Sequence, residues 1–338
     1  MNSRLTKSPQ VWKLATDLGL KPKDDPVSAI VEFARKQMGQ FLREFPCSTL
    51  QESLDMAAAR LDTHFIEIRS DADLGEIKSK YLTRSEIGFA DLELQLTDDV
   101  YAITFRLLNP KKHDRKFVSL IDFRGTKAWR CYFSKWHELA HLFTLTPQMR
   151  LKFCRSHSIA NQKDPEEAVM DVIAGKLGFL PEIVQKHASG EISFNKIQEL
   201  KDRLCPEASN QASVIGFTHS WPTPCVLIDA SPALRKQDRL GLNQSSFEFK
   251  EQPQPVLRAV KISTNEPARN AKLKIFPNMR IPQKSVINRV FTNSVAYDEA
   301  IEDLAWWNSS DGTRLPRRPV KVSARLNSGS VQALVVPV

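Results

Sequence analysis

Residues 129–143 read WRCYFSKWHELAHLF, and the rest of the chain is organised around this stretch. Its apolar residues recur at three- and four-residue spacing, which predicts an amphipathic helix. On that helix His137 and His141 are one turn apart, so both imidazoles project from one face and can hold one metal ion, with Glu138 beside it. This spacing is typical of zinc sites that hydrolyse peptide bonds with the carboxylate as general base. The alternative interpretation is an ordinary solvated helix face.

A catalytic zinc ion needs three protein ligands. A second helix is predicted where Asp164 and Pro165 form a cap and a first helical residue. Glu167 and Asp171 then share one face, so Glu167 is the expected third ligand and Asp171 the hydrogen-bond partner of a ligand histidine. Two alternatives stay open: Glu167 can serve as a capping-box residue, and Glu166 can be the ligand in its place.

Two motifs together resemble a known family. Residues 130–143 (RCYFSKWHELAHLF) are similar to the pattern R-x-x-F-T-x-A-H-E-x-G-H, and residues 167–181 (EAVMDVIAGKLGFLP) to E-x-x-A-N/D-x-F-A-x-x-L-L-x-P. Both patterns belong to the ImmA/IrrE family of bacterial zinc peptidases, and the likeness covers about residues 48–221. Ala140 stands where glycine is usual, and Ile173 replaces an aromatic residue.

The resemblance implies a zincin-like fold, in which the HExxH helix and the glutamate helix pack against a small sheet. It implies Zn2+ held by His137, His141 and Glu167, with Glu138 as general base. It also implies a regulatory endopeptidase that cuts a partner repressor, as in the IrrE and CapP sub-families, which have a further domain. The expected substrate is a helix-turn-helix repressor encoded nearby, and single-stranded DNA or a small ligand is the candidate activator. The alternative is a regulator that binds DNA or a transcription factor, with structural zinc and no proteolysis.

Composition limits the class of protein. With 338 residues and 41% hydrophobic content, the chain is long enough for two domains with packed cores. It has no apolar run of about 18 residues and no hydrophobic signal core, so a cytoplasmic protein without a membrane partner is expected. The five cysteines are scattered without a C-x-x-C and are predicted to be reduced thiols.

Patterning along the chain predicts an α+β protein with three segments: a helical N-terminal extension (1–47), the peptidase domain (48–221) and a C-terminal α+β sensor domain (222–338), GAF-like in kind. Helices are predicted at 26–45, 49–61, 74–82, 192–204, 207–218 and 295–307. Strands are predicted at 64–69, 100–108, 117–123, 225–228, 246–250, 256–263, 273–276, 320–326 and 332–336, the last two joined by a turn at Asn327 to Ser330.

Residues 101–108 are predicted to form an edge strand along which an extended peptide pairs its backbone, with a plain hairpin as the alternative. The region that follows is rich in lysine and arginine, which fits either a substrate with acidic flanks or ordinary solvation.

The loop between the two zinc helices carries two candidate site residues. A Cys154 thiolate could occupy the fourth zinc position and hold the enzyme latent, against the alternative of an idle thiol. His157 could donate to the oxyanion at the scissile carbonyl, against the alternative of a solvated side chain. Tyr101 and Tyr132 are equally unsupported in that role, so the residue that stabilises the transition state stays open.

Positive charge is concentrated in the last third of the chain. The net charge is +9, and residues 222–338 carry 17 lysines and arginines against 10 aspartates and glutamates, whereas the first 221 residues carry 31 against 29. Such an excess attracts nucleic acid or an acidic partner. The candidate contacts for single-stranded nucleic acid are Trp306, Trp307, Arg314, Arg317 and Arg318. The alternative is a pair of buried tryptophans beside a surface arginine cluster.

Overall fold

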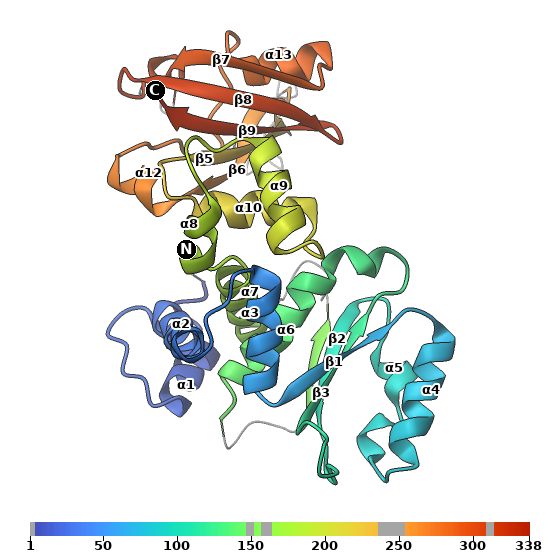
Figure 1. The fold of residues 1–338 in the computed structure, drawn as a ribbon. Helices are drawn as coiled ribbons and strands as arrows, with labels where there is room; N and C mark the ends of the chain where they lie inside the picture. Colours follow the sequence, from blue (N-terminus) through green and yellow to red (C-terminus); the bar gives the residue numbers. More distant parts are fainter. Residues whose placement is uncertain (1–3, 147–151, 157–163, 236–253, 309–313) are drawn as a thin grey trace, which may run out of the picture. The chain divides into compact units, whose positions relative to one another are not determined.

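The computed structural model describes residues 4–146, 152–156 (backbone only), 164–235, 254–308 and 314–338. It is a mixed α+β structure that divides into two compact units (Figure 1). Unit 1 comprises Met1–Ile183 and Leu200–Gly216, and unit 2 comprises Val184–Glu199 and Phe217–Val338. The N-terminal helices therefore belong to unit 1, and part of the helical region after residue 183 belongs to unit 2. Within the described ranges, no helix combines the length and apolarity needed to cross a bilayer.

The helices of unit 1 begin where short polar side chains cap them. Asp25 accepts a hydrogen bond from the Ser28 amide, and Thr49 and Glu52 form a capping box. These caps confirm the helices predicted near the N-terminus. The α-helices are α1 (Pro9–Asp17), α2 (Pro26–Glu44), α3 (Leu50–Arg60), α4 (Asp71–Leu82), α5 (Leu92–Gln95), α6 (Cys131–Phe143) and α7 (Pro165–Leu177). Next in the chain come α8 (Pro181–His187), α9 (Phe194–Leu204) and α10 (Asn210–Ser220), whose residues are divided between the two units.

The described strands of unit 1 form one sheet in the order β1-β3-β2-β4. Strand β1 (Thr63–Ile68) is parallel to β3 (Phe117–Asp122), while β2 (Val100–Arg106) is antiparallel to β3 and to β4 (Lys152–Ser156). Alternate residues face opposite sides of the sheet. Apolar residues on one face pack with α4 and α5, and the other face lies against α6 (Figure 1).

The prediction that residues 101–108 form an edge strand is wrong. Strand β2 has β3 on one side and β4 on the other, so its backbone donors and acceptors are already paired. The edge positions belong to β1 and β4. The error arises because β4 lies in the segment between α6 and α7 that the sequence pattern indicated to be a loop, and strand order depends on such long-range pairing.

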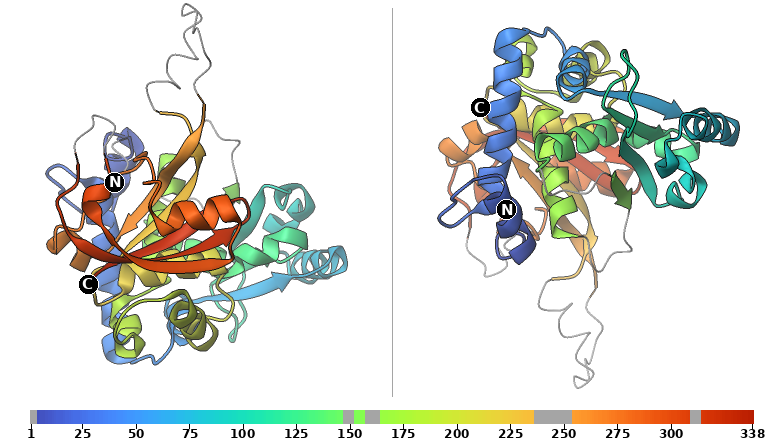
Figure 2. Two further views of the ribbon diagram at one scale, coloured as in Figure 1. Left: turned by 90° about the horizontal axis from the view of Figure 1, so that it is seen from above. Right: turned by 90° about the horizontal axis from the view of Figure 1, so that it is seen from below.

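Helices α6 and α7 pack closely in unit 1. The Tyr132 hydroxyl donates to the carbonyl of Gly178 at 2.7 Å, and the Thr144 hydroxyl lies 3.4 Å from the Met170 sulfur. A Cβ added at Gly178 would lie 3.2 Å from a carbon of the Trp136 ring, so glycine allows this close approach. Helices α1 and α2 pack against α7 (Figure 2).

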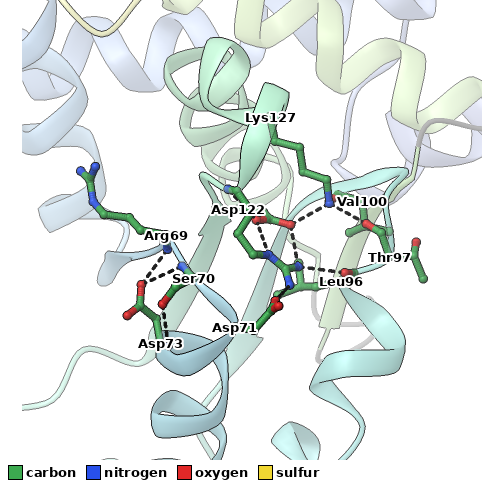
Figure 3. A network of polar contacts seen from close by, with 10 residues as sticks. Arg69, Ser70, Asp71, Asp73, Leu96, Thr97, Val100, Asp122 and Lys127 are labelled. Carbon is green, nitrogen blue, oxygen red and sulfur yellow. Dashed lines mark hydrogen bonds and ion pairs between the residues drawn. The ribbon is translucent and has the colours of Figure 1, made fainter.

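An ion-pair network anchors the segment that leads into α6 (Figure 3). Asp122, at the end of β3, accepts hydrogen bonds from Arg124 at 2.9 Å and from Lys127 at 2.7 Å. Lys127 also donates to the carbonyls of Thr97 and Val100. Both basic residues therefore have structural partners and are not free to bind a substrate with acidic flanks.

The pKa of Asp122 reflects this network. Burial raises the pKa of the carboxyl, but the hydrogen bonds from Arg124 and Lys127 outweigh it and hold the pKa below its ordinary value. The 3-10 helix Gly125–Arg130 that precedes α6 is fixed at its base in this way. The helix predicted around residues 129–143 is confirmed as α6.

The described strands of unit 2 form an antiparallel sheet in the order β6-β5-β9-β8-β7. Its strands are β5 (Val226–Ala233), β6 (Val256–Thr264), β7 (Tyr297–Asp303), β8 (Pro319–Asn327) and β9 (Ser330–Pro337), with helices α12 (Glu266–Asn270) and α13 (Val286–Asn293). Helix α13 packs on β7, β8 and β9 around a core that includes Trp307. The predicted turn is confirmed, with Ser328 and Gly329 at positive φ between β8 and β9.

Two elements predicted in this region are wrong. Residues 295–307 do not form one α-helix, because α13 ends earlier, β7 pairs with β8, and a short 3-10 helix follows at Leu304–Trp306. This extended backbone buries Glu302, whose carboxylate accepts hydrogen bonds from the Ser285 hydroxyl and the Val286 amide at the start of α13. Residues 273–276 form no strand, and the strand predicted at 246–250 lies outside the described residues.

Candidate metal centre

Helix α6 carries several buried polar side chains, and three of them are the residues of the HExxH pattern. His137, Glu138 and His141 are all nearly inaccessible to solvent, on a helix that is otherwise mostly apolar. Buried polar groups destabilise a fold unless other groups pair with them. The side chains that surround these three residues therefore indicate what the site can do.

Helix α7 provides two carboxylates that contact the histidines. Glu167 lies with Oε2 3.0 Å from His137 Nε2 and Oε1 3.3 Å from His141 Nε2. The two Nε2 atoms are 3.2 Å apart. Asp171 Oδ1 lies 2.9 Å from His137 Nδ1. The Nδ1–H group of neutral His137 then donates to Asp171. The lone pair of His137 Nε2 is thereby directed toward Glu167 and His141.

This donor set fits a zinc ion. In a tetrahedral site with ligand distances of about 2.0–2.1 Å, two donor atoms lie about 3.3 Å apart. The separations among His137, His141 and Glu167 are close to that value, and among the described residues these three form the one group whose ligand atoms all lie within 4.8 Å of one another. Two imidazole nitrogens and a carboxylate are a donor set that zinc accepts in enzymes.

The electrostatics distinguish the two adjacent glutamates of α7. Burial raises the pKa of Glu167, but its interactions with the adjacent imidazoles of His137 and His141 outweigh that effect, so the pKa lies well below the ordinary value. Burial raises the pKa of Glu166, and the nearby charge of Asp164 adds to that effect. Asp164 caps α7 by accepting from the Glu166 amide at 2.9 Å. The Glu167 carboxylate thus faces the imidazoles, and the metal-ligand group does not include Glu166.

Glu138 is oriented by a series of buried hydroxyl groups that the sequence analysis missed. Thr104 on β2 donates to Glu138 Oε2 at 2.7 Å. The Thr104 hydroxyl lies 2.7 Å from that of Ser119 on β3, which lies 3.1 Å from that of Thr63 on β1. We call Thr63, Ser119 and Thr104 the hydroxyl series. The signal that could have found it is the strand alternation, which puts all three on the sheet face that packs against α6.

The other candidates for transition-state stabilisation and latency are placed as follows. Tyr132 is fully buried and donates to a backbone carbonyl, and burial raises its pKa well above the ordinary value. Arg130 lies over the Tyr101 ring at 5.0 Å. Cys154 belongs to β4 with its backbone opposite Ile103, but its side chain, like the whole of His157, lies outside the described residues.

The candidate nucleic-acid contacts of unit 2 are separated by the fold. Trp307 is fully buried in the core, so its ring is not available for stacking. Arg317 pairs with Asp303, and Arg318 donates to the Ala271 carbonyl. Trp306 and Arg314 instead line one pocket.

Comparisons with known protein families and with curated proteins find no match to this chain.

Proposed function

We propose that this protein is a zinc-dependent endopeptidase of the ImmA/IrrE type, with a zincin-like unit 1 and a GAF-like sensor in unit 2. The observation that carries the proposal is the convergence of His137, His141 and Glu167 from two helices, with Glu138 buried next to His137 in the sequence of α6. In this proposal the three converging residues hold the ion. Asp171 acts through His137, whose ring it orients.

A bound zinc ion would supply a Lewis acid that polarises the scissile carbonyl and makes water more acidic. Glu138 is proposed to take the proton from the attacking water and to deliver it to the leaving amine. Its carboxylate needs a fixed orientation for both transfers, and the hydrogen bond from Thr104 provides it.

The proposed substrate is a helix-turn-helix repressor encoded beside this protein, and its cleavage would release genes under a stress-related or phage-related signal. A substrate backbone that pairs with the sheet of unit 1 would add to β1 or β4, since these are its described edges. Catalytic zinc sites typically have three protein ligands, and the described cluster offers three.

The test compares the wild-type full chain with its Glu138→Gln variant. Glu166→Gln, on the adjacent helix, is the matched control. Metal content is measured on each purified protein, and cleavage of the neighbouring repressor is followed by mass spectrometry. We expect about one zinc ion per chain in all three proteins and cleavage abolished in Glu138→Gln alone. Cleavage by Glu138→Gln at the wild-type rate would contradict the mechanism. Absence of stoichiometric metal would contradict the site itself.

A further inference from the structure

Unit 2 contains a pocket of about 650 Å³ at one side of its sheet. Its walls come from segments far apart in the sequence: Arg235 follows β5, Arg258 belongs to β6, and Arg280 and Lys284 lie on the segment before α13. Trp306 and Arg314 complete the wall. Pockets of about 300–1,000 Å³ accommodate small organic ligands.

The pocket is strongly basic. Five of its described lining residues are arginine or lysine, and none is aspartate or glutamate. Within the part of the chain that the structure describes, Arg235, Arg280, Lys284 and Arg314 form no ion pair. Other basic residues of unit 2 do form ion pairs. Arg289 lies 2.7 Å from Asp298, and Lys321 lies 3.1 Å from Glu191 and 3.5 Å from Glu299. Cations gathered without carboxylates repel one another, and a bound anion removes that repulsion.

The fold holds these cations in place. Arg258 is only 4% exposed and donates to the carbonyls of Ala233 at 3.2 Å and Asn278 at 3.0 Å. Its backbone forms a β-bridge with Arg280. A second bridge joins Asn308 to Arg314. Because backbone pairing fixes both sides of the pocket, little ordering is needed when a ligand binds.

Trp306 adds a planar apolar surface to this charged pocket. Its side chain is 39% exposed, while the adjacent Trp307 is fully buried and anchors the segment in the core. An indole ring beside cations is suited to stack on a heteroaromatic base whose phosphates the cations neutralise. Inorganic anions would use the charges but not the ring.

We propose that this pocket binds a nucleotide, a ligand with at least two phosphate charges and one planar base. The base stacks on Trp306, and the phosphates lie between Arg280 and Arg314, which form no ion pair among the described residues. This assignment rests on unit 2 alone and does not depend on the proposed peptidase function. A failure of zinc binding or of peptide cleavage would therefore leave it intact.

The experiment measures the binding of ATP, adenosine, pyrophosphate and an oligothymidylate of about 12 nucleotides to the full chain by calorimetry. We expect saturable one-site binding of ATP, weaker binding of pyrophosphate and none of adenosine. Affinity for ATP should fall about tenfold in each of Arg280→Ala and Arg314→Ala, and by a similar factor in Trp306→Ala. Affinity for pyrophosphate should be unchanged in Trp306→Ala.

Arg317→Ala is the matched control, because this arginine of unit 2 is exposed, lies outside the pocket and pairs with Asp303. Its ATP affinity should equal that of the wild type. Circular dichroism on each variant checks that it is folded, and the exposed positions Arg280 and Arg314 are chosen so that the core is unchanged. The proposal is overturned if ATP shows no saturable binding, if binding is equal in all the variants, or if only the oligothymidylate binds.

Discussion

In unit 1, Asp122 and Lys135 are buried charges that lie beside charge of the opposite sign, whereas the pocket of unit 2 brings together cations without a carboxylate in its described lining. Asp122 is held between Arg124 and Lys127, and Lys135 contacts two glutamates, Glu67 at 3.0 Å and Glu207 at 2.7 Å. In the pocket, Arg258 donates to the backbone carbonyls of Ala233 and Asn278.

Charges in the two units therefore have different roles: ion pairs stabilise unit 1, and unpaired cations in the pocket of unit 2 can attract an anion. Paired buried charges leave little attraction for a ligand, and removal of one partner exposes the full desolvation cost of the other. Clustered like charges destabilise the free protein slightly and favour the binding of an anion. If this comparison is right, substitutions in unit 1 lower stability or change the metal centre, and substitutions in the pocket change mainly ligand affinity.

The largest effect is expected for Asp122→Asn. Loss of this buried carboxylate leaves Arg124 and Lys127 without their common partner, and we expect the free energy of unfolding of unit 1 to fall by about 3–5 kcal/mol. Asp71→Asn removes the exposed partner of Arg124 and should cost at most about 1 kcal/mol. Chemical denaturation followed by circular dichroism measures both. Equal effects of the two substitutions would contradict the comparison.

Asp122 should also make the stability of unit 1 depend on pH. The folded-state pKa of Asp122 lies below its ordinary value of 3.8, so its contribution to stability is fully present above that pH and is lost as the pH falls through the folded-state pKa. The wild-type chain should therefore lose stability below about pH 4, and Asp122→Asn should lose less over the same interval. Denaturation midpoints measured from neutral to acid pH test this expectation. If Asp122→Asn lost as much stability in acid as the wild type, groups other than Asp122 would be responsible for the pH dependence.

The next largest effect is expected for Glu167→Gln, which removes a charged donor from the metal centre. Substitution of an outer hydrogen-bond partner of a metal ligand typically lowers metal affinity by about 10- to 100-fold, so loss of a direct ligand should lower zinc affinity by more than about 100-fold. Asp171→Asn should fall within the smaller range. Competition against a chromophoric chelator measures both, with Glu166→Gln as the control. If Glu166→Gln lost zinc and Glu167→Gln retained it, the ligand assignment would be reversed.

A smaller effect is expected for Thr104→Val. The variant keeps the shape of the side chain but removes the hydroxyl that donates to Glu138, and a hydrogen bond to a charged group is worth about 1.5–3 kcal/mol. We expect kcat for the repressor to fall by about 10- to 100-fold with zinc affinity and KM unchanged, because Thr104 positions the general base and does not bind the ion. Thr104→Ser retains a hydroxyl and should restore most of the activity. A loss of zinc in Thr104→Val would indicate a structural role instead.

The helices and the pairs of site residues within them could be predicted from the sequence because they depend on local signals. The capping groups Thr49 and Asp164 mark helix starts, and the spacing of His137 and His141 fixes their common face. The contact between Glu167 and the histidines needs tertiary packing, so local signals supported only a hypothesis about it, which the resemblance of both motifs to a known family sharpened.

Features that depend on long-range pairing could not be predicted. Strand β4 pairs with β2, with Cys154 opposite Ile103. No local sequence pattern specifies that strand order. Pairing with β8 likewise overrides the helical pattern at 295–307, and it places Glu302 of β7 where the Val286 amide at the start of α13 donates to its carboxylate. The basic pocket collects side chains from residues 235 to 314, so its charge is visible only in the folded unit.

The smallest effect is expected for Arg314→Gln in the absence of ligand. The substitution removes one of several like charges from an exposed position, so stability should change by no more than about 0.5 kcal/mol, toward a more stable protein at low ionic strength. The gain should vanish at about 1 M salt, where the screening length is about 3 Å. Arg317→Gln loses its ion pair with Asp303 and should not gain stability under either condition. Calorimetric unfolding at the two salt concentrations distinguishes the variants. A clear loss of stability in Arg314→Gln would mean that the free protein already compensates this charge, and the contrast between the two units would then fail at the pocket itself.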